Sequence, residues 1–480
     1  MEGSFYKISK NFALRGWDRL PNAIVNRKTG EVTFLSKEKM QVLLACDGMH
    51  DFNSLLVPQA IRDAVQEGVE KGFITPCSEG EGLDEYQEYH EYPNRYVSSV
   101  HWMITGKCNY RCKHCYMSAP EGTLPALSHE SIIKIVEQIA ECGIPTVSLS
   151  GGEPLVRDDI YDIITALCER GIVIRQLFSN GALVNERLLD HLEKYGQKPT
   201  LVISYDGVGG WHDWLRGVTG AEKKADKAIT LWHERGLPVF AQMTVHRGNA
   251  DKIRDTVLHL ASLGCDKARI NVAYEAGEWV LHNDGYLLEK NEYREILLDY
   301  IPKYYEDGMP MPVILNDLVS FDPRKPDKYY VVKIKSEKED FLNESVFACM
   351  GRKLQITPEG KISLCQAVNE NYLQLKPLVS DDPNEPVMPL AEAISEDSKI
   401  MQIFGTTHND LIKGSSECGE CPYFKACRGG CRGIPLVESG SIFGSNPDAC
   451  NMFKGGMIDK LIEVMQQVRP TAKGNITNMP

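Results

Sequence analysis

Ten of the fifteen cysteines in this 480-residue chain fall into two sets with regular spacing. The first set is Cys108, Cys112 and Cys115, and the second runs from Cys349 to Cys450. Such spacings are typical of metal or iron–sulfur ligation. The first twenty residues lack the continuous apolar core of a signal peptide, so we expect a cytoplasmic chain whose thiols stay reduced. The cysteines therefore predict a metalloprotein rather than a disulfide-bonded one.

Composition narrows the possible partners. A net charge of -13 disfavours broad binding to a phosphate backbone, so we expect no nucleic-acid partner. No apolar run approaches the roughly 20 residues that a membrane-spanning helix needs, so we expect no membrane partner. The length exceeds what one hydrophobic core usually serves, which predicts two or three domains.

The middle of the chain, residues 97–310, alternates between strand and helix. Six such repeats predict a parallel sheet with right-handed crossovers, as an open barrel or a doubly wound sheet. In both folds the chemistry lies at the carboxyl ends of the strands. The expected strands are Val100–Thr105, Thr146–Ser150, Val173–Phe178, Leu201–Tyr205, Val239–Val245 and Ala268–Val272.

The flanking zones differ from the middle. Residues 1–82 read as a small α+β module, with a hairpin around Lys28-Thr29-Gly30 and a helix capped by Ser36. Residues 83–96 are polar, acidic and aromatic, and we expect a linker there. We expect a bridging segment at 311–345, a Gly-rich and Cys-rich domain at 346–455, and a C-terminal helix and tail at 456–480.

The first cysteine set directly follows the first expected strand of the middle zone. Three thiolates spaced CxxxCxxC can each bind one iron of a cubane cluster and leave the fourth iron open to a small molecule. A structural zinc site is the alternative, with His114 as the nearest fourth ligand.

This arrangement resembles the radical S-adenosylmethionine (SAM) superfamily. Ser150-Gly151-Gly152-Glu153-Pro154 resembles that family's GGEP segment, whose exposed glycine backbone and carboxylate suit the SAM amino group. The resemblance implies that SAM ligates the open iron and is cleaved to a 5′-deoxyadenosyl radical. It also implies that other residues lie near SAM, with Arg216 pairing with its carboxylate and His114 where relatives often carry an aromatic near adenine. The residues implied near SAM are His114, Gly151, Gly152, Glu153, Ser179, Asn180, Ser204, Asp206 and Arg216.

The second cysteine set resembles the SPASM extension of peptide-modifying radical SAM enzymes. The resemblance implies three [4Fe–4S] clusters: one that binds SAM and two auxiliary ones. Some relatives carry a further cysteine a few residues before the first of this set, and this chain has none in the residues just before Cys349. One iron of an auxiliary cluster is therefore open to a substrate thiolate, or is closed by Glu344, water or another group. A zinc ribbon is the alternative. One auxiliary cluster would be ligated by Cys418, Cys421, Cys427 and Cys450, and the other by Cys349, Cys365 and Cys431.

The N-terminal module resembles the RiPP recognition element, a winged-helix-like domain that binds the leader of a ribosomal precursor peptide. The implied fold is α/β: a partial (β/α)6 TIM-like barrel with this N-terminal domain and a C-terminal Cys-rich SPASM domain. The implied function is peptide maturation that forms a thioether crosslink from a substrate cysteine, with a flavodoxin or ferredoxin-type electron donor. Carbon–carbon crosslinking, oxidative decarboxylation and sulfatase maturation stay open, as does a non-catalytic zinc-ribbon peptide-binding protein. Cys46, Cys77, Cys142, Cys168 and Cys265 are expected to be small buried side chains.

Overall fold

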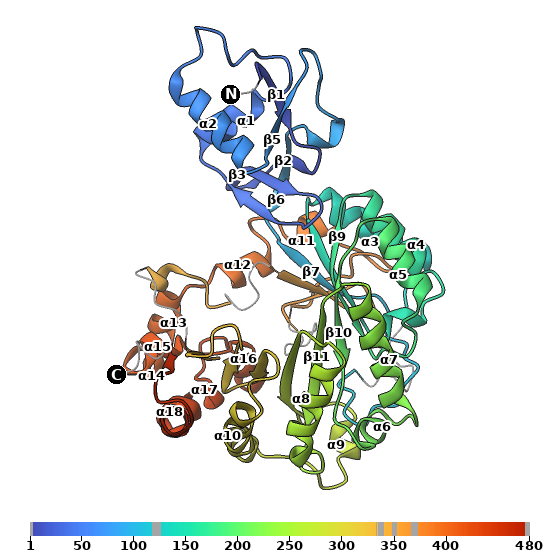
Figure 1. The fold of residues 1–480 in the computed structure, drawn as a ribbon, viewed down its shortest axis with the longest axis vertical. Coiled ribbons are helices and arrows are strands. Elements are labelled where there is room, and N and C mark those ends of the chain that lie inside the picture. Colours follow the sequence, from blue (N-terminus) through green and yellow to red (C-terminus); the bar gives the residue numbers. More distant parts are fainter. Residues whose placement is uncertain are drawn as a thin grey trace.

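A parallel sheet curved into an open barrel forms the centre of the molecule, and a smaller unit lies at each end of the chain (Figure 1). The computed structural model describes residues 3–117, 126–332, 334, 340–347, 353–365 and 373–475. None of the helices in these ranges combines the length and apolar character that a transmembrane span requires.

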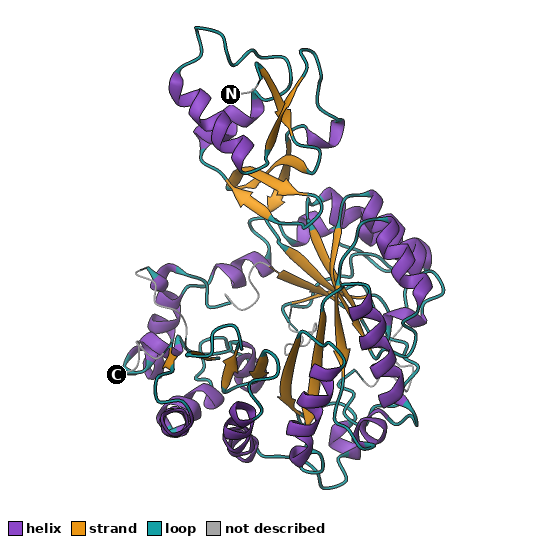
Figure 2. Cartoon of the chain, in the orientation of Figure 1, coloured by secondary structure: helices purple, strands orange, loops and turns teal. Residues whose placement is uncertain are grey.

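The barrel strands form where the sequence predicts them, because their alternate side chains are apolar and pack under the surrounding helices. Neighbouring strands from β7 to β12 pair in parallel. The helices cover the outer face of the sheet (Figure 2). The strands are β7 (Ser99–Met103), β8 (Thr146–Ser150), β9 (Val173–Ser179), β10 (Thr200–Ser204), β11 (Val239–Val245) and β12 (Lys267–Val272), and the helices are α3 (His129–Glu141), α4 (Ile160–Glu169), α5 (Glu186–Lys194), α6 (Trp211–Arg216), α7 (Ala221–Glu234) and α8 (Ile253–Ser262). The partial α/β barrel is confirmed.

The sheet extends beyond the six predicted strands on both sides. After α10 (Lys290–Glu306), β13 (Val313–Leu315) pairs in parallel with β12, so residues 311–345 do more than bridge two domains. β16 (Lys353–Ile356), from the Cys-rich region, pairs in parallel with β7. Local periodicity does not reveal such pairings, because the partners are far apart in sequence. The remaining strands of this sheet are β14 (Val319–Phe321), β15 (Lys328–Val331), β17 (Ile362–Ser363) and β18 (Lys473–Gly474).

The N-terminal unit packs its own core between strands and two helices. Its predicted hairpin is present as β3 and β4, and Ser36 caps α1 by accepting from the Lys39 N–H at 3.3 Å. The expected linker at 83–96 is wrong for His90–Arg95, which form β6 and pair with β2. Tyr92 of this strand stacks on the buried Trp17, which explains why an aromatic-rich segment is ordered here. The elements are β1 (Phe5–Ile8), β2 (Phe12–Asp18), β3 (Leu20–Asn26), β4 (Val32–Phe34), β5 (Ile74–Cys77), β6 (His90–Arg95), α1 (Lys37–Leu44) and α2 (Gln59–Glu70).

The N-terminal unit contacts the barrel at the end of α3 and the C-terminal region at Ile394. Trp17 Nε1 donates a hydrogen bond to the Cys142 carbonyl at 3.2 Å, and Arg95 N donates to the Ile394 carbonyl at 3.1 Å. The Cys-rich region beyond β17 consists of short helices that lie beside the open side of the barrel (Figure 1). They are α11 (Leu390–Ala393), α12 (Lys399–Gly405), α13 (His408–Gly414), α14 (Ser416–Gly419), α15 (Phe424–Cys427), α16 (Gly433–Ser439), α17 (Pro447–Lys454) and α18 (Met457–Val468).

Candidate active site

The loop that carries Cys108, Cys112 and Cys115 follows β7 and is held in place by α6. The N–H groups of Arg111 and Lys113 donate to the carbonyls of Arg216 and Leu215, at 3.2 and 2.9 Å. Gly217 ends α6 at φ 67°, and a Cβ there would lie 2.4 Å from the Arg111 carbonyl oxygen. Only glycine therefore lets the two segments approach this closely.

The three thiols are half-buried, and hydrogen-bond donors reach Cys108 and Cys112. The Tyr110 N–H donates to Cys108 Sγ at 3.4 Å, and Arg216 Nη1 donates to Cys112 Sγ at 3.7 Å. Burial raises the pKa of the Cys108 thiol to about 12, so a bound metal, rather than bulk pH, would have to displace its proton. In the described part of the chain, no three Cys, His, Asp or Glu side chains are grouped to bind a single metal ion. In a cubane cluster each thiolate binds a different iron, and this donor set fits such a group.

The Gly151-Gly152-Glu153 segment joins the ends of β7 and β8. The N–H groups of Gly152 and Glu153 donate to the carbonyls of Thr105 and Lys107, both at 2.9 Å. A Cβ at Gly151 or Gly152 would lie within 2.4 Å of those same carbonyl oxygens. The two glycines permit this close strand contact. The N–H groups of Gly152 and Glu153 are therefore bonded within the protein.

The Glu153 carboxylate is fully buried rather than exposed. It accepts hydrogen bonds from the Ser179 hydroxyl at 3.0 Å, the Asn180 N–H at 2.7 Å and the Leu155 N–H at 3.2 Å. Burial raises its pKa to about 7, although the backbone donors and Ser179 act against this shift. Asn180 Nδ2 in turn donates to Asn109 Oδ1 at 2.7 Å, within the cysteine loop. Glu153 thus connects the end of β8 to the end of β9, and through Asn180 to the cysteine loop.

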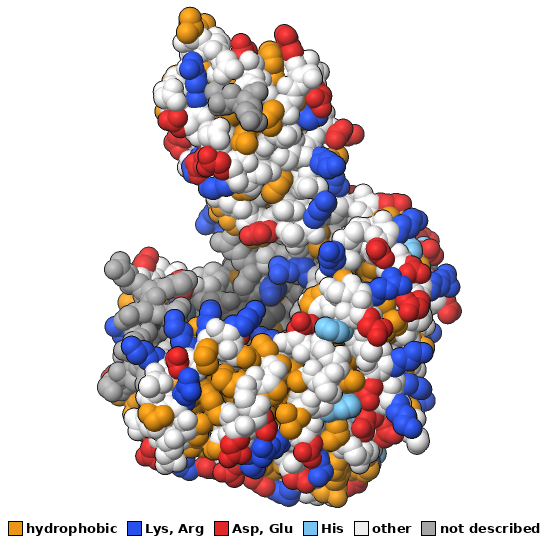
Figure 3. Space-filling view, in the orientation of Figure 1, with side chains coloured by type: hydrophobic (Ala, Val, Ile, Leu, Met, Phe, Trp, Pro, Cys, Tyr) orange, Lys and Arg blue, Asp and Glu red, His pale blue; other side chains and the backbone are white. Residues whose placement is uncertain are grey.

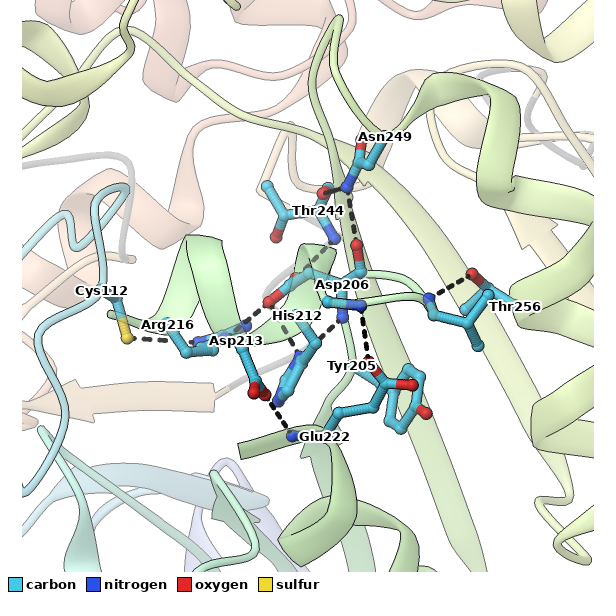
Figure 4. A network of polar contacts seen from close by, with 12 residues as sticks. Cys112, Tyr205, Asp206, His212, Asp213, Arg216, Glu222, Thr244, Asn249 and Thr256 are labelled. Carbon is cyan, nitrogen blue, oxygen red and sulfur yellow. Dashed lines mark hydrogen bonds and ion pairs between the residues drawn. The ribbon is translucent and has the colours of Figure 1, made fainter. Parts of the chain in front are cut away.

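Arg216 and Asp206 form a buried pair behind the cysteine loop (Figure 4). Asp206 Oδ2 accepts from Arg216 Nε at 2.5 Å, and Asp206 Oδ1 accepts from the Thr244 N–H at 2.9 Å. Burial opposes ionisation of Asp206, but the Arg216 charge and the neighbouring His212 ring hold its pKa well below its usual range. Ser204, two positions earlier, is the half-buried last residue of β10. A SAM carboxylate that paired with Arg216, as expected, would therefore share its guanidinium with Asp206 and Cys112.

Several buried polar atoms around this pair have no hydrogen-bond partner among the described residues. They are the Tyr110 hydroxyl, His114 Nδ1, His212 Nε2 and His246 Nε2. Buried groups of this kind normally have partners, so the site fits a ligand with hydrogen-bonding edges such as SAM. His246 lies directly after β11 and is enclosed by Trp211, Trp214, Trp279 and Tyr286. His246 is not among the residues predicted from the sequence, although its position just after the carboxyl end of a strand is typical of a site residue in this fold.

The second cysteine set is brought together in part. Cys418, Cys421, Cys427 and Cys450 line one pocket, closed by Phe424, Phe453 and other side chains. Asn446 caps α17, which carries Cys450, by accepting from the Ala449 N–H at 2.9 Å. Its Nδ2 donates to the Cys431 carbonyl at 2.7 Å. Four thiols around one largely apolar pocket fit a fully ligated iron–sulfur cluster.

Cys365 and Cys431 do not line this pocket. Cys365 is half-buried and Cys431 is exposed, whereas Cys349 lies outside the described residues. Glu344 Oε2 lies 3.5 Å from Arg428 Nη1, so this carboxylate has a cationic neighbour. Of the five other cysteines, Cys46, Cys142 and Cys265 are buried as expected, whereas Cys77 and Cys168 are half-buried.

Comparison with known proteins agrees with this site. Residues 102–261 match the family model of the radical SAM superfamily. Pre-heme d1 synthase of Dinoroseobacter shibae is 30% identical over 40% of this chain and 48% of its own length. PqqA peptide cyclase of Granulibacter bethesdensis is 29% identical over 55% of this chain and 66% of its own length. The chain therefore matches only about half to two thirds of the length of these relatives.

Among solved structures, SuiB of Streptococcus suis bound to its precursor peptide SuiA has the same fold. Its TM-score is 0.61 at 16% identity, and the match covers 93% of this chain and 100% of SuiB. The fold likeness thus extends over the barrel and both flanking units. Since the family model matches the segment that contains the cysteine loop, the Gly-Gly-Glu segment and Arg216, residues 102–261 of this chain are a radical SAM domain.

Proposed function

We propose that this chain is a radical SAM maturase that forms a thioether crosslink in a ribosomally made precursor peptide. The observation that carries the proposal is the pairing, in one chain, of a three-cysteine loop at the barrel's carboxyl end with a four-cysteine pocket in the C-terminal region. Similarity to SuiB, crystallised with a precursor peptide, and to PqqA peptide cyclase favours a peptide substrate.

The residues of this chain would hold the reacting groups in fixed positions. Cys108, Cys112 and Cys115 would hold a [4Fe–4S] cluster, which supplies the electron that cleaves SAM to a 5′-deoxyadenosyl radical. Arg216 places a positive charge at Cys112, and Asp206 fixes the orientation of that guanidinium. The rings around His246 would keep water from this part of the site.

The four-cysteine pocket would hold one auxiliary cluster, and Cys349, Cys365 and Cys431 would hold a second. An auxiliary cluster supplies an acceptor for the second electron of the oxidation. A thioether then forms with the loss of two hydrogen atoms from the peptide. One hydrogen leaves to the deoxyadenosyl radical, the thiol proton goes to solvent, and the remaining electron goes to the acceptor. A flavodoxin or ferredoxin-type protein would supply the reducing electron.

The N-terminal unit would bind the leader of the precursor. β4 is the edge strand of a four-stranded sheet, and Phe34 on it is 41% exposed. An extended peptide can pair with such an edge through main-chain hydrogen bonds.

The test is coexpression with a cysteine-containing precursor peptide, followed by mass analysis before and after alkylation with iodoacetamide. A thioether predicts a product lighter by two hydrogen atoms with one alkylatable thiol fewer, and no change with the Cys112→Ala variant. A product lighter by two hydrogens that keeps all its thiols would instead indicate carbon–carbon crosslinking. Loss of a formate mass would indicate oxidative decarboxylation.

A further inference from the structure

The inner face of the open barrel carries positive charge. In β11, Val239 and every second residue after it are buried in the core under the outer helices, and in β12 the same is true from Ala268 onward. The residues between them are only half-buried, so they face the interior of the barrel. These inner-face residues are Phe240, Gln242, Thr244, Lys267, Arg269 and Asn271.

Two cations on this face share one aromatic ring. Lys267 Nζ lies 5.4 Å, and the Arg269 guanidinium 5.3 Å, from the centre of the Phe240 ring. An arginine held over a ring still presents its edge N–H groups to a ligand. Arg269 Nε is buried and has no hydrogen-bond partner among the described residues. The pair is thus positioned without being neutralised.

No carboxylate of the described residues forms an ion pair with Lys267 or Arg269. Asp322 is the carboxylate that acts on Lys267, but it is already paired with Arg324 at 2.8 Å. Lys353 adds a third cation on β16, whose next inner-face residue is Gln355. The inner faces of β11, β12 and β16 therefore hold three cations and no Asp or Glu, although the chain's net charge is -13.

The register aligns Arg269 with Ser204, one of the residues expected near SAM. Ser204 pairs with Gln242, and Gln242 pairs with Arg269. Two strand spacings separate Ser204 from Arg269, which is roughly 10 Å. Figure 3 shows Lys and Arg side chains gathered where the surface is hollowed below the N-terminal unit. Lys267 is the first residue of β12, so it lies two positions nearer than Arg269 to the amino end of the barrel. A carboxylate bound between them would lie about 10 Å or more from Ser204, within reach of a peptide bound in the barrel.

We propose that Lys267 and Arg269 bind the carboxylate of an acidic residue in the substrate peptide, close in sequence to the residue that is modified. This inference rests on the proposed function and specifies its substrate: a peptide with Asp or Glu beside the reacting position. A guanidinium and an ammonium on one ring can bind the two oxygens of one carboxylate. Lys353 lies on the opposite side of β7 and extends the favourable potential to further acidic residues.

The test measures binding of a rhodamine-labelled tetraglutamate peptide to the iron-loaded protein by fluorescence anisotropy, with tetraglutamine as the uncharged probe. Tetraglutamate should bind about tenfold more tightly, and less so at high salt. Arg269→Gln and Lys267→Met should each remove most of that difference, whereas Arg269→Lys should keep part of it.

Two matched controls lie on the outer helix α5. Arg187 lies over the Tyr161 ring at 4.2 Å, and Lys194 lies over the Tyr195 ring at 5.0 Å. Arg187→Gln and Lys194→Met should leave tetraglutamate binding unchanged. Equal binding of the two probes, or equal losses in the inner and outer variants, would overturn the proposal.

A second measurement separates the peptide from SAM as the source of the carboxylate. Equilibrium dialysis with SAM should give the same affinity for the wild type and Arg269→Gln. A large loss of SAM affinity in this variant would mean that Arg269 binds the SAM carboxylate, and would overturn the proposal. Neither binding measurement requires turnover, so failure of the proposed reaction would be seen separately, as absence of deoxyadenosine from the wild type.

Discussion

Arg216 Nε donates to Asp206 Oδ2 at 2.5 Å, and the same guanidinium reaches Cys112 Sγ at 3.7 Å through Nη1. The end of β10 is thereby connected to the cysteine loop after β7 through one side chain. Asp206 is fully buried and Arg216 is 9% exposed, so neither charge can be solvated by water if the other is removed.

Asp206→Asn should destabilise the protein strongly, because it leaves Arg216 buried without its counter-charge. Breaking a buried pair in this way costs about 3–5 kcal/mol of unfolding free energy, which denaturant unfolding measures. The exposed Arg247–Glu292 pair, with N and O 2.6 Å apart, is the control. Glu292→Gln should have a much smaller effect, and equal losses in the two variants would contradict the role given to Asp206.

Glu153→Gln should destabilise the protein in a pH-dependent way. The substituted amide places an N–H₂ group opposite a backbone or hydroxyl donor, which costs about 1–3 kcal/mol. The pKa of Glu153 is raised from 4.5 to about 7 by burial. As pH rises, this carboxyl therefore loses its proton at a lower pH in the unfolded chain than in the folded protein. Its contribution to the free energy of unfolding falls as pH rises from about 4.5 to about 7 and is constant above that range.

The measurement is the free energy of unfolding of wild type and Glu153→Gln at about pH 5.5 and about pH 8. The advantage of the wild type should be larger at the lower pH. Glu137→Gln on the exposed face of α3 is the control for loss of a carboxylate that is not buried. An advantage that is the same at both pH values would mean that the three donors keep Glu153 ionised at both.

Cys450→Ala should remove about four irons and the matching sulfide from the reconstituted chain. The reason is that Cys450 shares one pocket with Cys418, Cys421 and Cys427. Cys168→Ala is the matched variant, because that half-buried thiol lies on α4 outside both cysteine sets. Iron and sulfide analysis measures both proteins, and an unchanged iron content in Cys450→Ala would exclude it as a ligand.

Trp17→Phe should loosen the N-terminal unit from the barrel, since the Trp17 indole donates to the Cys142 carbonyl at 3.2 Å. Loss of one such bond should speed proteolysis between β6 and β7 by up to about tenfold. Trp232→Phe removes a similar bond, to the Pro199 carbonyl at 3.2 Å, but within the barrel. Equal acceleration in both variants would show general destabilisation instead of undocking.

The sequence predicts most of the barrel, because each strand from β7 to β12 is a short apolar run between recognisable helices. It fails where pairing depends on residues far apart in the chain. His90–Arg95 look like a polar linker, yet they pair with β2 and stack Tyr92 on Trp17. Likewise, nothing local in Lys353–Ile356 indicates that this strand pairs with β7.

In the candidate site, too, the sequence predicts the positions of residues along the chain better than the contacts between them. The motifs place the first cysteine set, Glu153 and Asn180 just after β7, β8 and β9, and this placement holds, whereas Arg216 is the last residue of α6. What the motifs do not predict is how these side chains bind one another: Glu153 to Ser179 and Asn180, and Arg216 to Asp206. Those contacts depend on the three-dimensional approach of several strand ends, which spacing in one sequence does not encode.

Production of 5′-deoxyadenosine tests the central claim most directly. The wild type is reconstituted anaerobically with iron and sulfide, and the nucleoside is quantified after addition of SAM and dithionite. We expect deoxyadenosine from the wild type and none from Cys112→Ala. An iron-loaded wild type that yields no deoxyadenosine, or a Cys112→Ala variant that yields as much as the wild type, would contradict it.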